Sequence, residues 1–168
     1  MSIERIVAML DSGKSLDLPA LRAALQATRF DDAWMAAHCP NPMPVDGYGR
    51  DLLHTGADYE IVLATWPVGV GTQIHNHGAY SSYGMVRVLK GEIFNHVYAP
   101  DGVERVKLLY RESYVAGGMI EVPKGLLHCM GNARTDGHAM SLHVYSPRIV
   151  DVTYWDRETQ ELVGALVG

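Results

Sequence analysis

Hydrophobic residues recur at two different spacings along this chain. Over about the first 38 residues the spacing is that of amphipathic helices. The residues that carry this pattern are Ile3, Ile6, Val7, Leu10, Leu18, Leu21, Leu25 and Trp34. Gly13 follows the first group as a stop signal, and Pro19 is tolerated near a helix start. We therefore expect a helical N-terminal extension, residues 1–44, which ends in the proline-rich segment Cys39–Pro44.

From Tyr48 onward, short apolar runs alternate with turn signals such as Lys90-Gly91 and Gly117-Gly118. This alternation of short strands and turns is typical of an all-β barrel. The expected strands are Arg50–His54, Tyr59–Trp66, Thr72–His77, Gly84–Leu89, Glu92–Tyr98, Val103–Arg111, Met119–Val122, His128–Met130 and Met140–Tyr145. A last hairpin is expected from 152–155 and 161–167. The chain thus predicts one domain with a barrel over residues 45–150 and C-terminal strands over 151–168.

Two glycine-framed motifs contain three histidines. The first reads Gly69-x5-His75-x-His77 and the second Gly117-x5-Pro123-x-Gly125-x2-His128-x3-Asn132. Residues i and i+2 of a strand point to the same face, so His75 and His77 can aim at one point and His128 can join them from a neighbouring strand. Three imidazoles suit Fe, Zn, Cu or Ni better than Mg or Ca. A lone histidine would more often be a surface or core residue, but three in framed motifs favour a metal site.

These motifs resemble those of the cupin superfamily, small antiparallel β-barrels (jelly rolls) that hold a metal in the barrel mouth. The second motif fits at every signature position. In the first, the typical fourth ligand, a Glu, is missing, because the matching positions are Gly84, Ser81 or Ser82. The loop Gly78–Tyr83 is also about two residues longer than usual. The resemblance therefore implies a metal with three protein ligands and open positions for substrate and dioxygen.

A narrower resemblance is to the cysteine dioxygenases. It covers roughly residues 45–150, and the segment Ser141-Leu-His-Val-Tyr-Ser-Pro147 is its most specific piece. The other matching pieces are Tyr48-Gly-Arg50, Trp66, Ile74-His-Asn-His77 and Leu127-His128. The resemblance implies Fe(II) bound by His75, His77 and His128, and oxidation of a thiol to a sulfinate with both atoms of dioxygen.

The same resemblance assigns roles to residues around the metal. Tyr48 and Arg50 are implied to bind substrate, and a guanidinium can pair bidentately with a carboxylate. Ser141, His143 and Tyr145 alternate on one strand and match the family's hydrogen-bonded relay, which ends with the tyrosine hydroxyl near the iron. On pattern alone, the same alternation also describes a strand with one solvated face.

Gly84 aligns with the cysteine that is crosslinked to the matching tyrosine in the animal enzymes, so a thioether on Tyr145 is not available here. The glycine is similar to the bacterial branch of the family. Tyr80 and Tyr83 of the longer loop either line the substrate pocket or cap the barrel rim.

The composition and charge of the chain limit the classes of partner that we expect for it. With a net charge of −5, a pI near 5.9 and no basic stripe, nucleic acid is not expected. Apolar runs are too short for a membrane span, and the first residues do not read as a signal peptide, so we expect a cytoplasmic protein. Cys39 and Cys129 are expected to be free. The oligomeric state is left open.

Several alternatives stay open at this point. Within the class, a 3-mercaptopropionate dioxygenase is the closest, although its relatives typically carry Gln in place of Arg50. A non-catalytic metal-binding cupin and a Zn or Ni isomerase or hydrolase are the others, and the last would need Glu92 or Glu121 as a base. The remaining histidines are read as surface or turn residues, with His96 closest to the expected site; they are His38, His54, His96 and His138.

Overall fold

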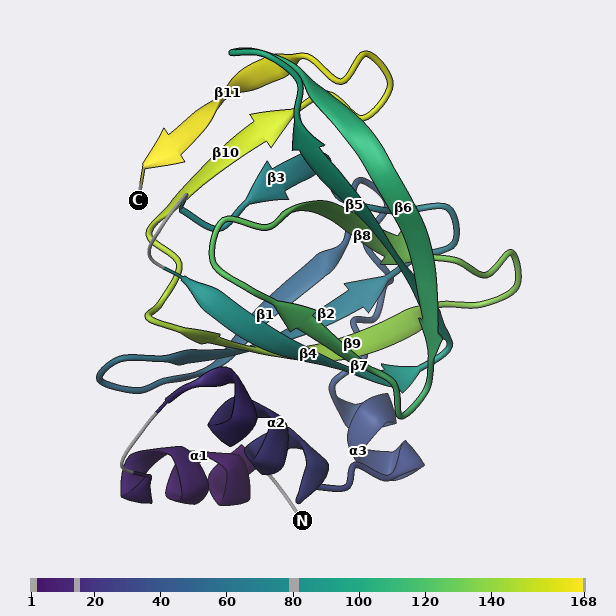
Figure 1. Cartoon of the computed structure of the whole chain (residues 1–168). Helices are drawn as coiled ribbons and strands as arrows, with labels where there is room; N and C mark the ends of the chain where they lie inside the picture. Colours follow the sequence, from purple (N-terminus) through teal and green to yellow (C-terminus); the bar gives the residue numbers. More distant parts are fainter. Residues whose placement is uncertain (1–2, 14–15, 79–81, 168) are drawn as a thin grey trace.

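Two antiparallel β-sheets face each other, and the N-terminal helices pack beneath the outer face of one of them (Figure 1). The structure is a computed structural model that describes residues 3–13, 16–78 and 82–167. The first sheet has the order β1-β2-β9-β4-β7 and the second the order β11-β10-β3-β8-β5-β6. Neighbouring strands in each sheet are therefore mostly distant in sequence, as in the jelly roll that the sequence predicts.

The first sheet consists of β1 (Gly49–Thr55), β2 (Glu60–Trp66), β9 (Ala139–Ser146), β4 (Tyr83–Lys90) and β7 (Met119–Val122). The second consists of β11 (Leu162–Val167), β10 (Asp151–Trp155), β3 (Ile74–Asn76), β8 (Leu127–Asn132), β5 (Glu92–Pro100) and β6 (Val106–Val115). All the expected strands are present, with bounds that are shifted by up to four residues. β3 is shorter than expected, because Thr72 is bonded to Met130 outside a regular ladder. β6 begins later and extends to Val115, which pairs with Glu92.

The helical region contains α1 (Ile3–Ser12), α2 (Leu18–Gln26) and α3 (Asp32–Ala37). The sequence predicts helices over about the first 38 residues with a stop at Gly13, and the structure adds a second break between α2 and α3. Asp31 causes the restart, since its carboxylate accepts a hydrogen bond from Trp34 N at 2.8 Å. None of the described helices is long and apolar enough to cross a membrane.

The strands β2 and β9 are buried on both faces, so their polar side chains are shielded from solvent. Leu63 and Leu142 point outward and pack with Leu21 and Leu25 of α2. The alternating residues of the same strands point inward between the two sheets, Trp66 among them. The helices therefore cover the face that would otherwise be solvated, and the polar positions of β9 are enclosed in the barrel.

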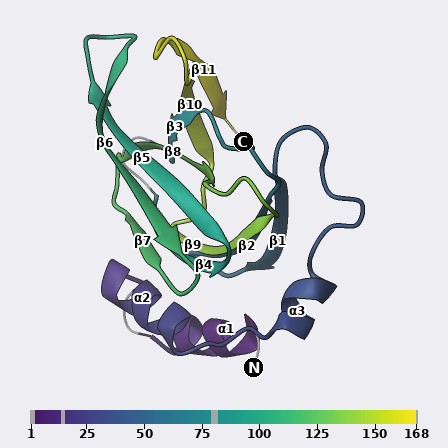
Figure 2. The same cartoon turned by 90° about the vertical axis from the view of Figure 1, so that its right-hand side faces the viewer.

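The C-terminal hairpin β10–β11 lies at the end of the molecule opposite the helices (Figure 2). β10 pairs with β3, and Tyr154 lies opposite His75 in that ladder. In the turn of the hairpin, Arg157 N donates to the side-chain oxygen of Gln73 at 2.9 Å. The hairpin therefore supports the short strand that carries His75.

Candidate metal and substrate site

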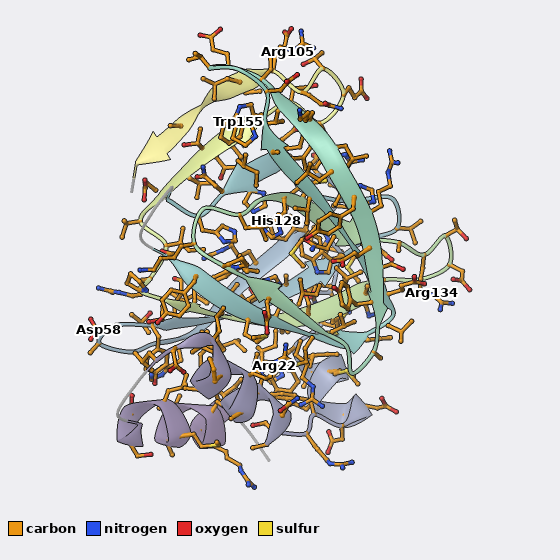
Figure 3. The ribbon with its side chains drawn as sticks, viewed as in Figure 1. Arg22, Asp58, Arg105, His128, Arg134 and Trp155 are labelled. Carbon is orange, nitrogen blue, oxygen red and sulfur yellow. The ribbon has the colours of Figure 1, made fainter. Side chains whose placement is uncertain are left out.

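His75, His77 and His128 come together between the two sheets. His75 lies opposite His128 in the β3–β8 ladder, and His77 follows β3 directly. One ring nitrogen of each histidine lies within 4.8 Å of the others, and the Nε2 atoms of His75 and His77 are 2.9 Å apart. All three side chains are buried, and Figure 3 shows His128 in the interior of the barrel. The convergence expected from the i, i+2 spacing is thus present.

Hydrogen bonds to the outer ring nitrogens orient two of these histidines. His75 Nδ1 donates to the carbonyl oxygen of Gln73 at 2.9 Å, and His128 Nδ1 donates to Asn95 Oδ1 at 2.8 Å. Because a carbonyl oxygen can only accept, Nδ1 carries the proton in both rings and Nε2 keeps its lone pair. His128 Nε2 is buried and has no hydrogen-bond partner among the described residues. An unpaired buried lone pair beside two further imidazoles fits a metal ion with nitrogen ligands.

Burial keeps these histidines neutral. Desolvation lowers the pKa of His75, and it lowers the pKa values of His77 and His128 well below the ordinary histidine value. Neighbouring imidazoles lower the pKa values of His77 and His128 further. Neutral imidazole is the form that binds a metal, so the site is prepared for an ion at neutral pH.

A cavity of about 470 Å³ leads to the histidines. His75 and His77 line its wall together with residues from both sheets and from the segment that precedes β1. Its polar lining includes Arg50, His143 and Tyr145, while Trp66 contributes an apolar wall. The predicted substrate residues therefore share one space with His75 and His77, and it is large enough for a small thiol. His128 lies against these two histidines without lining the cavity.

A chain of hydrogen bonds runs along β9 toward this cavity. Trp66 Nε1 donates to Ser141 Oγ at 2.8 Å, Ser141 Oγ is 2.8 Å from His143 Nε2, and His143 Nδ1 is 2.9 Å from the Tyr145 hydroxyl. The strand is buried on both faces, so the alternative of a half-solvated strand is excluded. The three predicted relay residues are in contact, and Trp66 extends the chain by one member.

The indole of Trp66 sets the direction of this chain, because it can only donate. Buried Ser141 receives that bond, and its own proton has His143 Nε2 as its acceptor among the described residues. The His143 proton then resides on Nδ1 and is donated to the tyrosine oxygen. The hydroxyl proton of Tyr145 is left free to donate into the cavity.

The pKa values of the relay agree with this assignment. Burial lowers the pKa of His143 to about 3, so its imidazole is neutral. Burial also raises the pKa of Tyr145, which therefore keeps its proton. Tyr48 stacks on Trp66 with ring centroids 4.4 Å apart, and burial raises its pKa as well. The cavity thus presents neutral hydroxyl donors near the histidines.

Arg50 lies at the mouth of the cavity with its side chain 45% exposed. Its Nη2 atom is 3.3 Å from Oε1 of Glu60, which is almost fully buried and lies opposite Tyr145 in the β2–β9 ladder. The ion pair holds one side of the guanidinium. Arginine has five N–H donors, so others remain for a ligand carboxylate.

In the loop 78–83, residues 79–81 are not among the described residues, so the expected role of Tyr80 lies outside them. Tyr83 does not line the cavity. Its hydroxyl donates to the carbonyl oxygen of Leu16 at 2.6 Å, and its ring packs with the helices.

The remaining histidines do not join the site. They are half-buried rather than fully exposed, and His54 and His96 lie within strands. The ring of His96 packs at a tilt against that of Phe94, whereas its neighbour Asn95 contacts His128. Cys39 and Cys129 are free, as expected.

The two acidic residues considered as bases lie elsewhere. Glu92 accepts a hydrogen bond from Ser113, and Glu121 pairs with Arg22 at 2.7 Å. Neither lines the cavity. Nothing in their placement supports a hydrolase or isomerase.

Sequence reasoning missed Asn95 and Glu60, and it gave Trp66 no role. The signal for Glu60 was a carboxylate at the start of a strand that is otherwise mostly apolar. Asn95 had no local signal, because its contact with His128 depends on the pairing of β5 with β8.

Comparison with known proteins agrees with this geometry. The family model described as cysteine dioxygenase type I matches residues 23–158, most of the chain. The chain belongs to the cysteine dioxygenase type I family. Cysteine dioxygenase type 1 of Bos taurus is 25% identical over 162 residues, covering 92% of this chain and 78% of the relative. The Homo sapiens protein is 26% identical with the same coverage.

Solved structures with the same architecture are more distant. A protein of Thermus thermophilus has a TM-score of 0.54 at 16% identity and covers 72% of this chain and 99% of its own. A double-stranded β-helix protein of Klebsiella pneumoniae has a TM-score of 0.53 at 16% identity, covering 71% and 90%. At this identity the likeness concerns the fold alone, and it is that of the cupin jelly roll.

Proposed function

We propose that this protein is a thiol dioxygenase that binds Fe(II) through His75, His77 and His128 and oxidises L-cysteine to cysteine sulfinate. Both oxygen atoms of one dioxygen molecule are added to the sulfur, and no further reductant is needed. The observation that carries the proposal is the cluster of three neutral imidazoles, two of which line one cavity together with Arg50 and Tyr145. Three neutral nitrogen ligands with no carboxylate leave room for substrate and dioxygen.

The bound iron would supply the redox chemistry that allows dioxygen to react with a thiolate. This chain's own residues orient the substrate. Arg50 pairs with the carboxylate of cysteine, and Glu60 keeps the guanidinium at the cavity mouth. Tyr48 borders the same cavity beside Arg50.

Tyr145 donates a hydrogen bond from its free hydroxyl proton to the reacting groups, while His143 and Ser141 hold that hydroxyl in place. The apolar surface of Trp66 excludes water from the same side. We place this reaction in the cytoplasm, since both cysteines are free thiols and the substrate is itself a reduced thiol.

Metal analysis after anaerobic purification, followed by dioxygen uptake with a panel of thiols, tests the proposal. We expect about one iron per chain and one sulfinate formed per dioxygen consumed with L-cysteine. The panel includes 3-mercaptopropionate, which keeps the carboxylate and lacks the amine, and cysteamine, which lacks the carboxylate. Faster turnover of 3-mercaptopropionate would identify it as the substrate. Iron binding without dioxygen uptake on any thiol would instead indicate a non-catalytic cupin.

A further inference from the structure

Asn95 contacts the three-histidine site from outside the substrate cavity. Its side chain is buried, and its Oδ1 atom accepts the hydrogen bond from His128 Nδ1 at 2.8 Å. Asn95 does not line the 470 Å³ cavity. It lines a second cavity of about 420 Å³, together with Val97, Tyr110 and Glu112. The amide therefore holds His128 from the side where substrate does not enter.

Among the three histidines, His128 is the one whose outer nitrogen is held by a side chain. His75 is held by the backbone carbonyl of Gln73, and His77 Nδ1 has no hydrogen-bond partner among the described residues. A backbone carbonyl cannot be replaced by mutation, whereas Asn95 can. A substitution of Asn95 can therefore change both the orientation of His128 and the charge of the group that accepts its hydrogen bond.

The orientation of the amide matters for the metal. If its nitrogen faced His128, the imidazole would have to accept at Nδ1 and carry its proton on Nε2, the atom that points to the other histidines. That proton would prevent His128 from binding an ion. In the observed orientation the amide nitrogen has no hydrogen-bond partner among the described residues. Asn95 lines the second cavity, whose lining also includes the polar side chains of Tyr110 and Glu112.

The charge of the acceptor matters as well. A carboxylate is the common alternative partner for a histidine that binds a metal, and it raises the basicity of the imidazole. With the neutral amide of Asn95 and three neutral imidazoles, a divalent ion would keep its full charge of two. A site of this charge favours an anionic ligand such as a thiolate.

We propose that Asn95 is a positioning residue that fixes the proton of His128 on Nδ1, and that its neutral amide tunes the site to take an anionic ligand. The first part concerns metal binding alone. The second part rests on the proposed function, because it assigns the anion to the class of thiolates.

Two substitutions separate these parts. Asn95→Leu keeps the number and branching of the side-chain heavy atoms and removes the acceptor, whereas Asn95→Asp keeps the acceptor and adds a negative charge. Asn132→Leu is the matched control, because Asn132 is also a buried amide of the same sheet, but it binds the carbonyl oxygens of Trp66 and Gly137 instead of a histidine. Asn95→Ala replaces the leucine variant if that variant does not fold.

The measurements are Co(II) affinity of the metal-free protein by chelator competition, and azide affinity of the Co(II)-loaded protein by absorption. Asn95→Leu should weaken Co(II) binding about ten- to hundredfold. Asn95→Asp should retain or tighten Co(II) binding and weaken azide binding about tenfold, since one negative charge is added behind the ion. Asn132→Leu should lower the melting temperature and leave both affinities unchanged.

Unchanged Co(II) affinity in Asn95→Leu, or the same loss in the control, would overturn the positioning role. Unchanged azide affinity in Asn95→Asp would overturn the charge role. Failure of the unsubstituted protein to bind Co(II) would instead refute the three-histidine metal site, and with it the proposed function. Normal Co(II) and azide binding without thiol oxidation would refute the dioxygenase proposal and leave the role of Asn95 standing.

Discussion

Gly84 lies directly opposite Tyr145 in the β4–β9 ladder, and a Cβ atom on Gly84 would be 2.4 Å from Cδ1 of the tyrosine ring. The ring can lie against β4 only because residue 84 has no side chain. The space that a side chain at position 84 would fill is thus occupied here by the ring itself. The glycine is required for the placement of the hydroxyl at the cavity.

Gly84→Ala is therefore expected to displace the Tyr145 ring and its hydroxyl. Misplacement of a reacting group by about 1 Å can cost up to about a hundredfold in rate, so turnover should fall strongly while iron content is retained. Gly164→Ala is the control, because a Cβ there meets nothing within 4 Å. Steady-state dioxygen uptake measures both variants. Equal rates in the two would show that the ring tolerates the added methyl group.

Tyr145→Phe removes the hydroxyl and keeps the ring. Folding and iron content should barely change, because the ring packing is retained, while turnover should drop or dioxygen uptake should exceed sulfinate formation. The intact mass of the unsubstituted protein should be that of the plain chain, without the loss of two hydrogens that a thioether brings. Wild-type rates with tight coupling in the variant would contradict a role for the relay.

Arg50→Ala removes the carboxylate partner and leaves the histidines untouched. A hydrogen bond to a charged group contributes roughly 1.5–3 kcal/mol, so the apparent affinity for cysteine should fall about ten- to hundredfold with iron retained. Arg105→Ala is the control, since Arg105 forms an exposed ion pair with Glu161. Cysteamine oxidation tests the role independently. If the unsubstituted protein uses cysteamine as well as cysteine, Arg50 does not act through the carboxylate.

Trp66→Phe tests whether the indole sets the direction of the relay. The phenyl ring preserves much of the stacking on Tyr48, but Ser141 loses the donor that orients it. The loss of one hydrogen bond is worth about 0.5–1.5 kcal/mol, so turnover should fall by about two- to tenfold. Trp155→Phe is the matched control, because Trp155 Nε1 has no partner among the described residues. A decrease of the same size in both variants would contradict the assignment.

The sequence predicted those parts of the site that depend on alternation within one strand. His75 with His77, and Ser141 with His143 and Tyr145, share a face because side chains alternate, whatever the neighbouring strands are. The glycine-framed motif added His128, since it resembles a known pairing. Members of both groups, His75 and His77 from one and His143 and Tyr145 from the other, line the same cavity.

The contacts that could not be predicted are those that depend on strand order and register. Asn95 reaches His128 because β5 pairs with β8, with Val97 directly opposite His128 and Asn95 two residues away on the same face. Glu60 reaches Arg50 across the β1–β2 pair, where a bulge shifts the register. A single sequence does not give these registers, because many pairings satisfy the same alternation.

The depressed pKa of His143 makes stability depend on pH. Between its folded pKa of about 3 and the ordinary value of 6.5, the unfolded chain binds a proton that the folded protein does not. The free energy of unfolding should therefore decrease as pH falls below 6.5, by at most about 1.4 kcal/mol per pH unit from this one group.

Urea unfolding of the metal-free protein at several pH values between about 5 and 7 measures this dependence. His143→Gln cannot titrate, so its free energy of unfolding should fall less steeply than that of the unsubstituted protein. Ser141→Ala is the control, because it breaks the relay and retains the titrating imidazole. The control should keep the steep slope even though its overall stability is lower. Parallel slopes for His143→Gln and the unsubstituted protein would show that His143 is not held neutral by burial in the fold.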